Sequence, residues 1–233
     1  MPTRQPTART AVLVFAKSAG VDLGQRFGTL PPTVRRRLAR GLEYQVRQQV
    51  RASGLPYVLS TERDQRGDTY GERLANACAD ALALGYERLV VVGGDCPGLR
   101  ARHLREAAAA LATGRAVVGR DLRGGVYLFG VDVARFRVSA LAGLPYRSAV
   151  LAKALTDVLG GDTDVAELER LGDVHSLGDL RREWRRLCAV GLRHVVRNAV
   201  AACAKTRDAA AGATLGDGGV GTATAMRGPP AAA

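Results

Sequence analysis

The 233-residue sequence has little of what marks a zinc-binding, disulfide-bonded or membrane-spanning protein. Its four cysteines form no C-x-x-C pair and stand apart from the three histidines, which excludes the common zinc and disulfide frameworks. No stretch approaches the roughly 20 uninterrupted apolar residues that span a bilayer, and the opening MPTRQPTART has no hydrophobic signal core. We therefore expect a soluble, cytoplasmic protein whose cysteines are small core residues.

Lysine and aromatic residues are also scarce. Arginine outnumbers lysine 31 to 3, the formal net charge is +12, and aromatic residues make up 5% of the chain. Half of the excess charge lies in residues 181–233, which hold 9 basic and 3 acidic residues. The few aromatic side chains do not interleave with the arginines as a base-stacking surface requires. A biased genomic composition explains the charge, so we expect no nucleic-acid partner, although an arginine-rich nucleic-acid binder stays as a third hypothesis.

Short apolar runs alternate with amphipathic segments along the chain. In one such segment, Val34, Leu38, Leu42, Val46 and Val50 recur every four residues and form an apolar helical stripe. Continuous apolar strands between such helices predict an α/β fold, with a mostly parallel central sheet covered by helices on both faces. The expected strands are 11–16, 57–61, 89–92, 116–119 and 126–131, and the expected helices are 33–54, 69–85, 101–114 and 148–159, with further helix beyond 179.

The strand LVVV, residues 89–92, ends in two glycines followed by Asp95. Ligands of open parallel sheets bind outside the carboxyl ends of the strands, where this carboxylate would lie. A carboxylate there is suited to Mg²⁺ or Mn²⁺ that bridges phosphate oxygens. The alternative is a turn in which Asp95 accepts backbone N–H groups ahead of Pro97.

Two motifs carry a resemblance to a known family: GGDCPGL at 93–99 and GRDLRGGVYLFGVD at 119–132. They resemble motifs of the small bacterial glycosyltransferase-like proteins of the nucleotide-diphospho-sugar transferase superfamily, which are related to molybdenum-cofactor and phospholactate nucleotidyltransferases. The resemblance extends over residues 10–190. The further similar motifs are VFAK at 14–17, QRGDTYGERLANA at 65–77, LPYRSAVL at 144–151 and DVHSLGDL at 173–180.

The resemblance implies a Rossmann-like fold and a metal-dependent transferase. The donor would be a nucleoside-diphosphate sugar for glycosyl transfer, or a nucleoside triphosphate for nucleotidyl transfer, with Mg²⁺ or Mn²⁺ as cofactor and an unknown acceptor. Asp95 would be the catalytic metal ligand, with Asp121 as a second ligand. The resemblance implies that the nucleotide is bound by Lys17, Gln65, Gly71 and Arg73, and that Gly124, Gly125 and Tyr127 form the acceptor pocket.

Several of these residues also have structural interpretations. Thr69 and Glu72 fit a helix capping box, and paired glycines are typical of a bend or bulge at a sheet edge. The sequence departs from the family where Arg123 replaces an acid and His175 replaces a second acid, and the usual first-loop lysine is absent. These departures favour an alternative function, a catalytically silent member that acts as a ligand-binding or interaction module.

The chain divides into a start expected to be disordered (1–9), the transferase-like domain (10–180), a basic helix (181–207) and an alanine- and glycine-rich tail expected to be disordered (208–233). The basic helix has an apolar side that is typical of packing on the core or against a second subunit, and a homodimer is compatible with it. Contact with an anionic membrane surface is the less expected alternative. We expect His103 and His194 to be surface residues.

Overall fold

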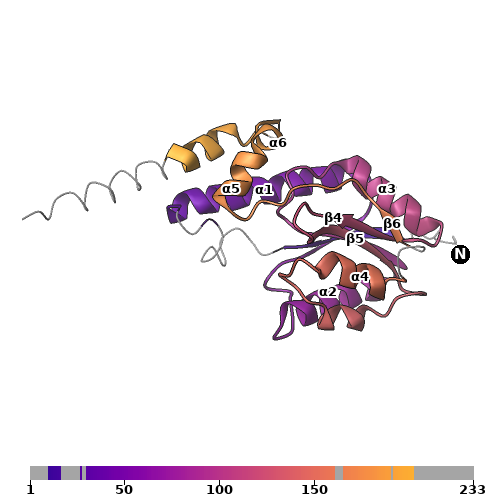
Figure 1. Ribbon diagram of the computed structural model, residues 1–233. Helices are drawn as coiled ribbons and strands as arrows, with labels where there is room; N and C mark the ends of the chain where they lie inside the picture. Colours follow the sequence, from indigo (N-terminus) through magenta and orange to yellow (C-terminus); the bar gives the residue numbers. More distant parts are fainter. Residues whose placement is uncertain (1–9, 17–26, 28–29, 161–164, 190, 202–233) are drawn as a thin grey trace, which may run out of the picture.

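The computed structural model describes residues 10–16, 27, 30–160, 165–189 and 191–201 (Figure 1). One six-stranded sheet has the order β2-β1-β3-β5-β4-β6. Five strands run in one direction, and β5 is antiparallel to both of its neighbours, β3 and β4. The strands are β1 (Thr10–Phe15), β2 (Tyr57–Ser60), β3 (Arg88–Val92), β4 (Ala116–Arg120), β5 (Val126–Asp132) and β6 (Val165–Glu167).

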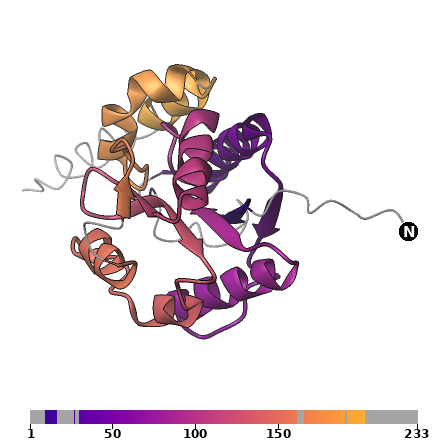
Figure 2. The same ribbon diagram turned by 90° about the vertical axis from the view of Figure 1, so that its right-hand side faces the viewer.

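Helices cover both faces of the sheet, as Figure 2 shows. The side chains of β1 alternate between the two faces: Leu13 packs in a cluster with α2, and Val14 in a cluster with α1 and α3. The expected α/β architecture with a mostly parallel sheet is therefore confirmed. The helices are α1 (Pro32–Ser53) and α3 (Ala101–Ala112) on one face, and α2 (Tyr70–Ala83), the 3₁₀ helix η1 (Val138–Gly143) and α4 (Leu151–Val158) on the other.

The periodicity of the sequence predicts most of these elements. In α1 the predicted stripe is confirmed, because Leu38, Leu42, Val46 and Val50 are all buried. The sequence analysis misses β6 and η1. Three residues of β6, one of them buried, are too few to show a strand pattern, and this strand forms only by pairing with β4 at the edge of the sheet.

The segment after Asp179 differs from the single basic helix predicted at 181–207. Its described part consists of α5 (Leu177–Arg182), α6 (Trp184–Ala189) and helical residues 193–201. Gly191 has a φ of 79° and follows the end of α6, and Leu192 N donates to Leu187 O, which is a typical glycine helix end. Leu180, Leu187, Leu192 and Val196 pack on α1, so the expected contact with the core is confirmed for this part. The predicted terminal segments 1–9 and 208–233 lie outside the described residues.

The helices give no indication of a membrane span. Among the described residues, none of them is both long enough and apolar enough to cross a bilayer.

We expect Gly71→Ala to destabilise the fold. A Cβ at this position in α2 would meet the backbone carbonyl of Ala142 in η1, which cannot move aside as a flexible side chain could. Overpacking of this kind costs about 2 kcal/mol, which exceeds the gain of about 1 kcal/mol in helix propensity. Denaturant unfolding should therefore show a lower free energy of unfolding.

The matched control is Gly143→Ala, in the same contact region, where a Cβ meets nothing within 4 Å. If both variants are equally stable, the close contact of α2 with η1 is not what requires glycine at position 71.

Candidate functional site

The candidate site lies at one edge of the sheet. The carboxyl ends of β1, β3, β4 and β6 meet the amino end of the antiparallel strand β5 at this edge. Asp95 follows β3, Asp121 and the paired glycines lie between β4 and β5, and Asp173 and His175 follow β6. Residues far apart in the sequence are therefore brought to the edge where ligands of such sheets bind.

Asp95 lies beside the loop that begins the DVHSLGDL motif at 173–180, one of the motifs that carry the family resemblance. The Nδ1 atom of His175 is 3.7 Å from Oδ2 of Asp95, and Nε2 of the same ring is 3.9 Å from Oδ2 of Asp173. Val174 N also donates to the backbone carbonyl of Asp95 at 3.0 Å. The imidazole therefore stands between two carboxylates, and the two loops are joined by a backbone hydrogen bond.

The carboxylates of Asp95 and Asp173 are oxygen donors of the kind that Mg²⁺ and Mn²⁺ accept. Within the described part of the chain, no group of three or more His, Cys, Asp and Glu side chains is placed to hold a metal ion. Mg²⁺ is commonly held by one or two carboxylates together with substrate phosphates. The donor set therefore fits an ion shared with a bound nucleotide, and not a site built from protein ligands alone.

Asp121, the second predicted metal ligand, stabilises the turn of the β4–β5 hairpin. Its Oδ1 accepts hydrogen bonds from Arg123 N at 2.6 Å and from Gly125 N at 2.7 Å. A Cβ on Gly125 would collide with this carboxylate, and one on Gly124, whose φ is 88°, would meet the backbone of Ala149. The register of the hairpin also shifts at Gly119/Arg120. The bend interpretation of the glycines is thus confirmed, and metal binding by Asp121 stays a prediction.

Arg123, which stands where the family has an acid, pairs with a buried carboxylate. Its Nη1 lies 3.3 Å from Oδ2 of Asp179, whose side chain is only 2% exposed. The same oxygen accepts hydrogen bonds from the backbone N–H groups of His175 at 3.0 Å and Ser176 at 2.8 Å. Burial opposes ionisation of Asp179, but these hydrogen bonds and the charge of Arg123 outweigh it and hold the pKa of the carboxyl below its usual value.

Of the predicted nucleotide-binding residues, Gln65, Gly71 and Arg73 lie around the start of α2, where each has a structural contact. Gln65 Nε2 donates to Ser60 O at 3.2 Å, and Arg73 Nη1 donates to Asp68 O at 3.1 Å. The predicted capping box of Thr69 and Glu72 is confirmed, with both reciprocal hydrogen bonds present. Gly71 packs against η1, and Lys17 lies outside the described residues. Nucleotide contact by Lys17, Gln65, Gly71 and Arg73 stays a prediction.

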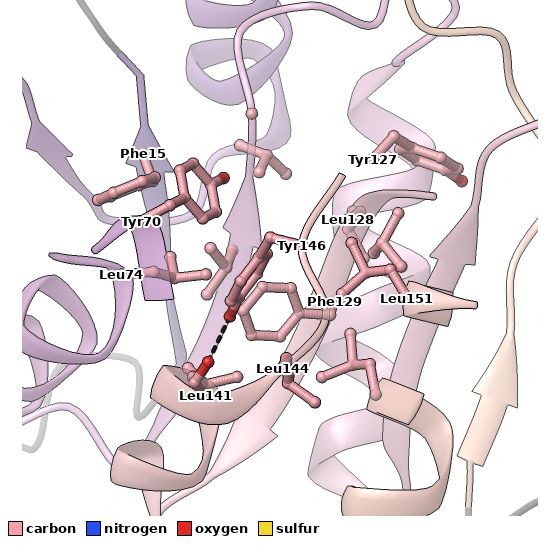
Figure 3. Close-up of a pocket in the computed structure, with 15 residues that line it drawn as sticks. Phe15, Tyr70, Leu74, Tyr127, Leu128, Phe129, Leu141, Leu144, Tyr146 and Leu151 are labelled. Carbon is pink, nitrogen blue, oxygen red and sulfur yellow. Dashed lines mark hydrogen bonds between the residues drawn. The ribbon is translucent and has the colours of Figure 1, made fainter. Parts of the chain in front are cut away.

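A pocket of about 80 Å³ lies between the sheet edge, α2, η1 and α4 (Figure 3). Its walls include Phe15, Tyr70 and Tyr146, whose rings form a contiguous group: the Phe15 and Tyr70 centroids are 5.5 Å apart, and those of Tyr70 and Tyr146 are 4.7 Å apart. We call this cavity the aromatic pocket. Its aliphatic lining includes Leu74, Leu151 and Leu155.

Tyr127, predicted for the acceptor pocket, lines the aromatic pocket but directs its ring elsewhere. The ring packs in the cluster on the opposite face of the sheet, and its hydroxyl donates to Glu169 O at 2.8 Å. Figure 3 shows it apart from Tyr70 and Tyr146. The phenol of Tyr127 therefore has a packing role, and its contact with an acceptor stays a prediction.

Tyr70 and Arg147 are candidate site residues to which the sequence analysis gave no role. The neighbouring rings desolvate the Tyr70 phenol, and the charges of Asp95 and Asp173 act in the same direction, so its pKa is raised to about 12 while Arg147 opposes the shift. Arg147 has a φ of 64°, unusual for a residue with a side chain, and forms no ion pair with any described residue. The only sequence signal was their place in the motifs at 65–77 and 144–151.

His103 is a correction to the sequence analysis, which expected it at the surface. Its side chain is buried in α3, with Nδ1 accepting from Arg100 N at 3.1 Å and Nε2 lying 3.4 Å from Glu169. The alanine-rich pattern of α3 gave no sign of this, because the partners come from the helix start and from a distant loop. His194 is exposed, as expected.

Comparison with solved structures defines the class of fold first. The chain resembles a protein from Desulfovibrio desulfuricans G20, provisionally assigned as a nucleotide-diphospho-sugar transferase, with a TM-score of 0.71 and 19% identity over 85% of this chain and 98% of that one. The chain therefore has a nucleotide-diphospho-sugar transferase-type fold. The model of a family described as "Uncharacterized protein conserved in bacteria (DUF2064)" matches residues 34–148, just under half of the chain.

Two further structures have lower TM-scores. Rv0371c from Mycobacterium tuberculosis H37Rv, in a complex with manganese, has a TM-score of 0.44 at 20% identity over 74% of this chain and 96% of that one. CMP:2-keto-3-deoxy-manno-octonic acid synthetase complexed with CTP has a TM-score of 0.39 at 13% identity over 77% and 98%. No curated protein matches the sequence.

We expect Asp179→Asn to reduce stability by about 3 kcal/mol, because the buried hydrogen-bonding network loses its charge. A lowered pKa in the folded state means that the carboxylate stabilises the protein at neutral pH and that this contribution is lost as the pH falls through the folded-state value. The variant should therefore lose part of the acid sensitivity of wild-type unfolding, measured by denaturant titration between about pH 3 and pH 7.

Arg123→Ala is the comparison, because this arginine side chain is 46% exposed. Its loss should cost less than about 1 kcal/mol. An Asp179→Asn variant with wild-type stability and wild-type pH dependence would contradict the role given to this carboxylate.

Proposed function

We propose that the protein is a metal-dependent transferase that binds a nucleotide donor, either a nucleoside-diphosphate sugar or a nucleoside triphosphate, at the edge marked by Asp95. The observation that carries the proposal is the meeting of Asp95, Asp173 and His175 at the carboxyl edge of a sheet of this fold, beside a pocket that leads away from them. The fold itself supports the broad class of reaction, and these side chains support the place where it occurs.

Asp95 and Asp173 would hold the divalent ion together with the phosphate oxygens of the donor. Bound there, Mg²⁺ or Mn²⁺ supplies charge neutralisation on the leaving phosphate. Arg147 carries a positive charge that no described acid neutralises, and it directly follows Tyr146, whose ring lies in the pocket wall, which supports a place near the same mouth. We assign it to a phosphate of the donor, since arginine can donate two parallel hydrogen bonds to phosphate oxygens.

The sequence analysis took Arg123 as a reason to favour the catalytically silent alternative. Its ion pair with Asp179 weakens that reason. Its charge is opposed by that of Asp179, so the exchange of an acid for Arg123 does not leave an unpaired cation beside Asp95. The missing first-loop lysine concerns residues that the structure does not describe. Binding of nucleotide without turnover would identify the silent alternative.

We expect Asp95→Asn to weaken binding of a nucleoside diphosphate in the presence of Mn²⁺ by at least about 100-fold, because a neutral amide is a much poorer ligand for the ion. Calorimetric titration with and without Mn²⁺ measures this, with a panel of uridine, cytidine, guanosine and adenosine diphosphates. Asp157→Asn, an exposed carboxylate on α4 that pairs with Lys153, is the matched control and should bind as wild type does. Metal-dependent binding that survives in Asp95→Asn would place the metal site elsewhere.

We expect Arg147→Gly to separate affinity from stability. Loss of a charge-assisted hydrogen bond to phosphate should weaken nucleotide binding by about 10- to 100-fold. The backbone of residue 147 is in the left-handed region, where glycine is free of strain, so the free energy of unfolding should change by less than about 1 kcal/mol.

Arg137→Gly is the control, an exposed arginine with an ordinary φ of −86°. It should keep full nucleotide affinity and lose slightly more stability than Arg147→Gly. Equal affinities in the two variants would remove Arg147 from the site.

A further inference from the structure

The aromatic pocket adjoins the proposed reaction centre. Its lining includes Val92 and Gly93 at the end of β3, and Gly93 is two residues before Asp95. On its other side it is lined by Val126, the first residue of β5, directly after the paired glycines. A molecule that occupies the pocket therefore approaches the carboxylates from the side of the β4–β5 hairpin.

Most of the accessible lining of the pocket is apolar. No charged residue is among the described residues that line it. The Tyr146 hydroxyl is already used, since it donates to Leu141 O at 2.7 Å, and burial raises its pKa above the usual range (Figure 3). Protein interiors leave few voids larger than a water molecule, so an apolar space of this size at the reactive edge favours an apolar group of a ligand.

Tyr70 is the exception in this apolar lining. Its hydroxyl makes no hydrogen bond to any residue in the described part of the chain, and the residue is 42% exposed although its ring packs between Phe15 and Tyr146. The negative charges of Asp95 and Asp173 act on this phenol. Tyr70 thus has an apolar ring in the pocket wall and a hydroxyl that has no partner in the described part of the chain and that experiences the charges of Asp95 and Asp173.

We propose that the aromatic pocket is the acceptor subsite and that it selects an acceptor with a compact apolar group, a single ring or a branched aliphatic chain, next to its reacting hydroxyl. A volume of about 80 Å³ suits a compact apolar group that enters from the mouth of the pocket. Tyr70 is the specificity-determining residue, because its ring contacts the apolar group and its hydroxyl hydrogen-bonds the acceptor oxygen. This inference rests on the proposed function for the identity of the reaction, but the pocket can be tested without it.

The test is a titration of protein labelled at leucine and valine methyl groups with benzyl alcohol, followed by NMR. Benzyl alcohol should shift the methyl signals of Leu74, Leu151 and Leu155 with a millimolar dissociation constant, and glycerol should not. Leu151→Phe, at the partly exposed rim, fills the pocket and should weaken binding at least 10-fold. Leu84→Phe, the same change at an exposed position outside the pocket, should leave binding unchanged. Leu144→Phe is the second pocket-filling variant, should Leu151→Phe fail to fold.

Tyr70→Phe tests the hydroxyl separately. Benzyl alcohol should bind about 3- to 10-fold more weakly to this variant, whereas toluene, which has no hydroxyl, should bind as it does to wild type. A purely structural role for Tyr70 would change both affinities together.

Competition distinguishes an acceptor site from a donor site. Benzyl alcohol and a Mn²⁺–nucleoside diphosphate should bind at the same time. The acceptor assignment is overturned if nucleotide displaces benzyl alcohol, if the pocket methyl signals do not respond, or if Leu151→Phe and Leu144→Phe bind as wild type does. Failure of the proposed function has a different signature, the absence of Asp95-dependent nucleotide binding while the methyl signals still respond to benzyl alcohol.

Discussion

The candidate site depends on one buried carboxylate. Asp179 accepts hydrogen bonds from the backbone of His175 and Ser176, caps α5, and pairs with Arg123 in the β4–β5 hairpin. It thereby joins the loop after β6 to the hairpin. The cost of burying its charge is met by several donors at once, which is the condition under which a buried ion is stable. Together with the hydrogen bond from Val174 N to Asp95 O, it holds His175 beside Asp95.

The remaining geometry follows from the direction of the strands. Because β5 alone is antiparallel, its amino end lies beside the carboxyl ends of β3 and β4, and the aromatic pocket forms between its first residues and α4. The carboxylates of Asp95 and Asp173 are on the sheet edge, and the rings of Tyr70 and Tyr146 are below it, on the face covered by α2. A polar edge with two carboxylates and an apolar pocket are thus neighbours, and Tyr70 lies between them.

Arg123 illustrates how the partner of a motif residue can come from a distant part of the chain. Compared with the family pattern it is a reversal of charge at a site where an acid is expected, and taken alone it favours loss of function. In the structure its partner is Asp179, which lies 56 residues further along the chain. His103 also has a partner from a distant part of the chain. The sequence analysis expected this histidine at the surface, but it is buried, because Arg100 and Glu169 satisfy its two ring nitrogens.

The sequence by itself determined five strands of the sheet and the main helices, because hydrophobic periodicity is a local signal, and the strand-end glycines before Asp95 predicted a role for that edge. It also determined the capping box of α2, whose two partners are three residues apart. Only the tertiary structure decided that Asp95 and Asp173 lie on either side of His175, that Asp121 holds a turn, and that the described part of the basic segment after 180 is broken into short helices packed on α1. These outcomes depend on contacts between residues far apart in the chain, and such contacts leave no periodic trace in the sequence.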